Sequence, residues 1–117
     1  MRLEAKKYLF DIQKATNLLA QFTAGRELAD YLRDAMLRAA VERQFEIIGE
    51  ALTQLAKLDG ELAARITEHR RIISFRNILI HGYADVDDRL VWDVIATKLP
   101  GLKQEVQALL SGPGMVP

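Results

Sequence analysis

One apolar stripe in the middle of the chain constrains the fold more than any other feature. Its members follow one another at steps of four or three residues, and they are Leu37, Val41, Phe45, Ile48, Leu52 and Leu55. This period belongs to an α-helix with one buried face. It predicts a helix over residues 35–58, which Asp34 caps and Asp59-Gly60 ends. A second apolar row widens the stripe and consists of Met36, Ala40, Ile47, Ala51 and Leu58. So wide a face has to contact more than one neighbour, within one bundle or across a dimer.

The segments on both sides of this helix predict further helices. One is expected over residues 3–24 with Gly25 as its stop, and a short one over residues 27–32. Another is expected over residues 68–81, with Gly82 as the C′ residue just beyond its end. Asp87 or Asp88 can cap the next helix, which Pro100 either kinks or separates from a last helix ending near residue 110.

Composition sets the fold class. Half of the 117 residues are hydrophobic, and glycine and proline are sparse. This balance favours an all-α fold, and the length suits one domain. We therefore predict an antiparallel bundle of four to six helices over residues 1–111, followed by a flexible tail over residues 112–117.

Charge and cysteine usage exclude several classes of function. The chain carries sixteen basic and sixteen acidic residues, which argues against bulk non-specific binding of nucleic acid. Without cysteine there is no disulfide, thiolate nucleophile or zinc–thiolate site. His69 and His81 lack the spacing of a two-histidine metal site, so no metal is expected. No apolar run approaches the ~20 residues of a membrane span and no signal peptide is evident, so a cytoplasmic protein is expected.

Arg76 is the residue whose position most needs an explanation. It falls on the same helical row as Ile72 and Ile80, in apolar surroundings. A guanidinium cannot lose its charge, so it must meet a carboxylate or line a cleft that receives an anion. Both interpretations remain open. Glu46 and Glu50, four residues apart, are the expected carboxylates, and the glycine between them, Gly49, would permit close approach of another helix or of a ligand.

His81 has two interpretations as well. A surface histidine at a helix C-terminus is the structural one, and general acid–base catalysis is the functional one. Five residues along a straight helix separate two side chains by about 140°. Arg76 and His81 therefore converge only if the helix breaks before Gly82, or if two copies of the chain share the site.

Basic residues also gather just before Arg76, where Arg65, His69, Arg70 and Arg71 lie close together in the sequence. Such a cluster is either a solvated helix face or a substrate-binding surface. Arg70 and Arg71 are the candidates for substrate contact.

The segment Ser74–Tyr83 resembles the signature of the HEPN superfamily, most closely its HepT-like branch. That signature has an arginine, four residues, a histidine, one residue and a tyrosine, which are here Arg76, His81 and Tyr83. Residues 45–51 resemble the long second-helix motif of the family, and residues 86–102 resemble its C-terminal pattern. The chain departs from the family where a tryptophan often precedes the Ile-Ile pair, because residues 68–71 are Glu-His-Arg-Arg.

The resemblance implies a dimeric, metal-independent RNA endonuclease without a cofactor, acting as the toxin of a toxin–antitoxin pair on tRNA or mRNA. Arg76 and His81 would be catalytic, with Glu46, Glu50 and Asn77 in support. Tyr83 would be adenylylated by a partner, a minimal nucleotidyltransferase antitoxin of the MntA type. The alternative is a non-catalytic nucleotide-binding or scaffold subunit of a nucleotidyltransferase complex.

Overall fold

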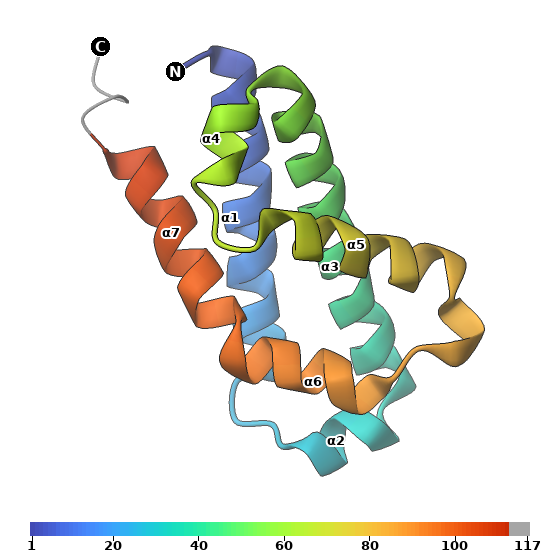
Figure 1. Cartoon of the computed structure of the whole chain (residues 1–117). Coiled ribbons are helices and arrows are strands. Elements are labelled where there is room, and N and C mark those ends of the chain that lie inside the picture. Colours follow the sequence, from blue (N-terminus) through green and yellow to red (C-terminus); the bar gives the residue numbers. More distant parts are fainter. Residues whose placement is uncertain (113–117) are drawn as a thin grey trace.

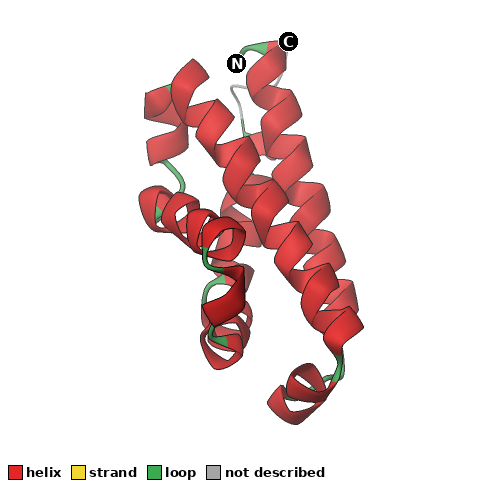
Figure 2. Cartoon of the chain, turned by 90° about the vertical axis from the view of Figure 1, so that its right-hand side faces the viewer, coloured by secondary structure: helices red, strands yellow, loops and turns green. Residues whose placement is uncertain are grey.

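The computed structural model describes residues 1–112, except for the side chain of Tyr83. Its elements in chain order are α1 (Leu3–Thr23), α2 (Leu28–Arg33), α3 (Ala35–Leu58), α4 (Gly60–Ala64), α5 (His69–His81), the 3-10 helix η1 (Tyr83–Asp85), α6 (Asp88–Thr97) and α7 (Leu99–Ser111). Every regular element of these residues is a helix, joined to the next by a short loop (Figure 2). The predicted all-α bundle is confirmed, although these residues form seven α-helices rather than the predicted four to six. Of the predicted tail, residues 113–117 lie outside the described part of the chain.

Three long helices form the body of the bundle. α1 and α3 run antiparallel side by side, and α7 lies along α1 (Figure 1). The predicted stripe of α3 is buried throughout, from Leu37 to Leu55, and meets the buried side chains Leu9, Ile12 and Leu19 of α1. α5 crosses α3, so that α3 packs against α1 and α5 together, as its wide apolar face requires.

Capping residues set the helix boundaries. Asp34 caps α3 by accepting a hydrogen bond from the Leu37 amide at 3.0 Å. Asp87, rather than Asp88, caps α6 by accepting from the amides of Arg89 and Leu90. Gly25 ends the turn after α1 with a φ of +70°, a conformation that favours glycine. Pro100 lies in the first turn of α7, where its missing N–H costs nothing, so it starts a helix rather than kinking one.

Several details of the sequence prediction were wrong. The short helix α4 was not foreseen, because Asp59 both ends α3 and caps α4 by accepting from the Leu62 amide at 3.1 Å. Gly82 ends α5 with a φ of −109°, so it is not a left-handed C′ residue. α5 begins at His69, one residue later than predicted, because Glu68 adopts a left-handed conformation with a φ of 56°. Met36 is 82% exposed and takes no part in the core.

None of the helices in residues 1–112 combines the length and the apolarity that crossing a membrane would require.

Candidate functional site

The site is built where α5 crosses α3. Gly49 is buried at this crossing, and a Cβ atom placed on it would overlap the Cβ of Arg76 and lie 2.6 Å from its Cγ. Only glycine lets the two helices come this close. The close approach expected at Gly49 is confirmed, and it brings Arg76 against the backbone of α3.

The guanidinium of Arg76 is fixed by two neighbours. Its Nη2 donates to Oε2 of Glu50 at 2.7 Å, and its Nη1 donates to Oδ1 of Asn77 at 3.0 Å. The Arg76 side chain is 25% exposed, and its Nε is buried without a hydrogen-bond partner among the described residues. Since a guanidinium has five N–H donors, one N–H on each Nη atom is left without a partner in this part of the chain. Arg76 is therefore held in place and still able to bind an anion.

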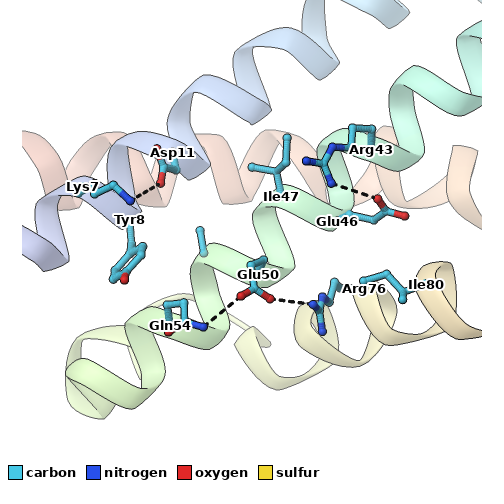
Figure 3. A pocket seen from close by; sticks show the side chains of 11 residues that line it. Lys7, Tyr8, Asp11, Arg43, Glu46, Ile47, Glu50, Gln54, Arg76 and Ile80 are labelled. Atoms are coloured by element: carbon cyan, nitrogen blue, oxygen red, sulfur yellow. Dashed lines mark hydrogen bonds and ion pairs between the residues drawn. The ribbon is translucent and has the colours of Figure 1, made fainter.

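Glu46 and Glu50 do not act as a pair. Only Glu50 contacts Arg76, whereas Glu46 lies 3.6 Å from Nη1 of Arg43 in an ion pair within α3. Both carboxylates nevertheless line one pocket with Arg76 (Figure 3).

This pocket has a volume of about 370 Å³ and lies between α1, α3 and α5. α1 contributes Lys7, Tyr8 and Asp11, residues that the sequence analysis did not single out. The polar pattern of Lys7, Tyr8 and Asp11 beside the apolar face of α1 is the only signal in the sequence that could have indicated them. Nothing in the sequence says that this face meets residues 43–54 of α3.

The charged side chains that line the pocket sum to a net charge of zero. Among the described residues, three cations line the pocket and each has a carboxylate within 4 Å. The shortest nitrogen–oxygen distances are 3.8 Å from Lys7 to Asp11, 3.6 Å from Arg43 to Glu46 and 2.7 Å from Arg76 to Glu50. A wall of zero net charge does not by itself attract a phosphate deep into the pocket.

His81 lies outside this pocket. It is the last residue of α5 and is exposed, and the helix continues unbroken from Arg76 through His81. Ile80, not His81, lines the pocket beside Arg76. Of the two arrangements left open by the sequence, a helix break before Gly82 is therefore wrong, and one chain does not bring Arg76 and His81 together there.

The remaining predicted residues lie around the two ends of α5. Arg70 and Arg71 are exposed in its first turn, where Arg71 lies 3.2 Å from a carboxylate oxygen of Glu68. Arg71 also borders a second groove of about 630 Å³ between α5, α6 and α7. The backbone of Tyr83 begins η1, which only Gly82 separates from α5, while the Tyr83 side chain lies outside the described part of the chain.

A second polar cluster joins α2, α3 and α6. Arg38 donates to the carbonyl oxygens of Tyr31 and Leu32 and lies 3.7 Å from Asp88. Burial raises the pKa of Glu42, with Asp88 and Glu46 adding to the effect and Arg38 opposing it. Burial also raises the pKa of Tyr31, whose ring packs on that of Trp92 at 5.3 Å. These contacts connect helices and do not open onto the pocket beside Arg76.

Across residues 1–112 no three His, Asp or Glu side chains gather in a way that could hold a metal ion.

Comparison with known proteins shows clear relatives. The sequence profile of the ribonuclease HepT-like family matches residues 12–109. A protein of Thermococcus cleftensis named "Probable ribonuclease HepT" is 35% identical over 109 residues, which cover 93% of this chain and 98% of that protein. A protein of Methanocaldococcus jannaschii that is named as a candidate RNase is 32% identical, over 89% of this chain and 94% of the relative. A third protein, from Caldanaerobacter subterraneus, is also named as a candidate RNase. It is 31% identical over 90% of this chain and 93% of the relative. No solved structure is significantly similar to this chain.

Proposed function

Because the chain belongs to the HepT-like ribonuclease family of the HEPN superfamily, we propose that it is a metal-independent RNA endonuclease with Arg76 and His81 as its catalytic residues. The observation that carries this proposal is the state of Arg76. Its guanidinium is fixed by Glu50 and Asn77 at the crossing of α3 and α5 and keeps terminal N–H groups for a ligand. Two donors of one planar guanidinium suit two oxygens of a phosphate.

The chemistry needs few groups. The 2′-hydroxyl of RNA attacks the adjacent phosphorus, a base removes its proton, and the leaving 5′-oxygen receives a proton. His81, whose imidazole is exposed, would exchange these protons, while Arg76 would stabilise charge on the phosphorane oxygens. DNA lacks the attacking 2′-hydroxyl, so this mechanism selects RNA, such as tRNA or mRNA.

The two proposed catalytic residues point in different directions from α5. We therefore propose a homodimer in which the α5 helices of two copies line one cleft. Arg76 would then act with His81 of the other copy. Arg70 and Arg71, exposed at the start of α5, would contact the RNA backbone further along this cleft.

Tyr83 would be the control point of a toxin–antitoxin pair. A nucleotidyltransferase partner of the MntA type would attach AMP to its hydroxyl, adding bulk and negative charge two residues from His81 and repelling the RNA phosphate. Mass spectrometry of the chain co-expressed with such a partner should find Tyr83 carrying AMP and the nuclease silenced. If the partner silences the nuclease while Tyr83 stays unmodified, control would instead be steric, by the partner covering the cleft.

Cleavage in EDTA tests the proposed function directly. Purified protein should cut tRNA or mRNA, and His81→Ala should lower the rate by about 10²–10⁴-fold, the usual contribution of a general acid–base group. His69→Ala, which removes the only other histidine, is the matched control and should cut normally. If EDTA abolishes cleavage, or if His81→Ala cuts as fast as the wild type, the proposal fails. If no RNA is cut with or without EDTA, the chain is better described by the alternative, a non-catalytic nucleotide-binding or scaffold subunit.

A further inference from the structure

The pocket beside Arg76 extends well past the guanidinium, towards α1. Tyr8 projects from α1 on the side where α3 presents Glu50 and Gln54 (Figure 3). Neither Tyr8 nor Gln54 is needed to hold Arg76 or to activate a hydroxyl. Their position next to the proposed phosphate-binding group calls for an explanation of its own.

Several polar groups in this part of the pocket lack a hydrogen-bond partner within residues 1–112. Among the described residues, neither the hydroxyl of Tyr8 nor the carboxylate of Asp11 makes a hydrogen bond. Lys7 Nζ forms an ion pair with Asp11, but at 3.8 Å it is too distant for a hydrogen bond. Gln54 donates its Nε2 to Glu50 at 3.0 Å, which leaves its Oε1 as an acceptor. The unsatisfied groups of Asp11 and Gln54 are therefore acceptors, beside an aromatic ring.

We propose that this pocket binds one unpaired nucleobase of the RNA, adjacent to the phosphate that Arg76 holds. Tyr8 would stack on the base, and Asp11 and Gln54 would accept hydrogen bonds from its exocyclic amino group. The inference rests on the proposed ribonuclease function and adds a preference for adenine, cytosine or guanine over uracil, which has no amino group.

A neutral, flat ligand fits the pocket better than a second phosphate. The pocket wall has no net charge, and a phosphate would face the carboxylates of Asp11, Glu46 and Glu50. A base brings no charge and offers a face to Tyr8, the usual way in which proteins read single-stranded RNA. The volume of about 370 Å³ lies within the range of small-ligand pockets, about 300–1,000 Å³.

The ring of Tyr8 can be made available for stacking. Lys7 Nζ lies 5.1 Å from its centroid, but the Lys7 side chain is 70% exposed. A cation–π contact at an exposed site is weak, so a base can displace the ammonium, which can then turn towards the RNA backbone.

Binding of tetranucleotides tests the subsite without any cleavage. The probes are single-stranded 2′-O-methyl homotetramers of A, C, G and U, in which the attacking hydroxyl is blocked. The first three should bind more tightly than the U tetramer. Tyr8→Leu, which keeps an apolar side chain at this half-buried position, should weaken their binding by about tenfold or more. Tyr8→Phe should recover most of that loss, and Asp11→Asn should reduce the discrimination against U.

The matched control is Phe10→Leu. This variant removes another aromatic ring of α1, one that is 52% exposed and lies outside the pocket, and it should bind like the wild type. Equal binding by Tyr8→Leu and Phe10→Leu would overturn the inference. So would nucleoside monophosphates that bind as tightly as the tetramers, because the pocket would then be a site for free nucleotides.

The same variants separate this inference from the proposed function. If the wild type shows cleavage that depends on His81 but Tyr8→Leu changes neither binding nor the sites of cleavage, the base subsite is wrong and the nuclease stands. If binding depends on Tyr8 but no cleavage depends on His81, the subsite stands and the nuclease assignment is wrong.

Discussion

The carboxylate of Glu50 has one evident task, which is to hold Arg76. The ion pair is short, at 2.7 Å, but Glu50 is 48% exposed, so its contribution to stability is at most about 1 kcal/mol. Glu50→Gln should therefore lower the free energy of unfolding slightly and reduce cleavage together with it, because Arg76 loses its charged partner. Denaturant unfolding and cleavage rates measured on the same preparation check this.

Glu46→Gln is the matched comparison, since Glu46 lies one turn away on α3, lines the same pocket and pairs with Arg43 instead. It should affect cleavage less than Glu50→Gln does. A Glu50→Gln protein that loses activity at unchanged stability would show that Glu50 takes part in the chemistry, contrary to this assignment.

The crossing of α3 and α5 depends on the missing side chain of Gly49. Alanine is the better helix former by about 1 kcal/mol, yet its Cβ would overlap that of Arg76, and overpacking of this kind costs about 1–3 kcal/mol. The clash should prevail, because the overlapping atom belongs to the Arg76 stem next to its backbone and cannot move without α5. Gly49→Ala should thus unfold at lower denaturant concentration and cleave RNA poorly.

Gly101 provides the control for this substitution within the same fold. It lies near the start of α7, and nothing stands within 4 Å of a Cβ placed on it. Gly101→Ala should leave cleavage unchanged and stabilise the protein, by up to about 1 kcal/mol. If Gly49→Ala were stabilised to the same extent, the close packing of the two helices would be of no consequence for Arg76.

For the molecule as a whole, the orientation of α5 predicts a site completed by a second copy. Arg76→Ala and His81→Ala should each be inactive alone. In a symmetric dimer that combines Arg76 of one copy with His81 of the other, co-refolding the two variants in equal amounts leaves one intact site in each mixed dimer. Cleavage should return to about a quarter of the wild-type rate, because half of the dimers are mixed and each has one of two sites.

A site contained within one chain gives no such recovery, since every chain in the mixture lacks one of the two residues. Sedimentation of the wild-type protein supplies the second measurement. A monomer at micromolar concentration would contradict the shared cleft.

Local signals along the chain were sufficient to predict most of the helices. The helical spacing of the α3 stripe, the capping side chains of Asp34 and Asp87 and the position of Pro100 are signals that each act within one or two turns. They can therefore be recognised without knowing the fold. The prediction failed where one residue serves two elements, as Asp59 does between α3 and α4, and where conformation departs from residue preference, as at Glu68 with its positive φ.

The sequence by itself determined that this is an all-α chain, that Arg76 needs a partner, and that Gly49 marks a close approach. It also indicated that Arg76 and His81 diverge, because helical geometry is local. Only the tertiary structure decided that Glu50 rather than Glu46 meets Arg76, and that Tyr8 and Asp11 lie beside them. The reason is physical: two carboxylates four residues apart share a face of α3, and the choice between them depends on where α5 crosses it. Likewise, the partners of α1 lie dozens of residues away, and no local pattern records which helix faces will meet.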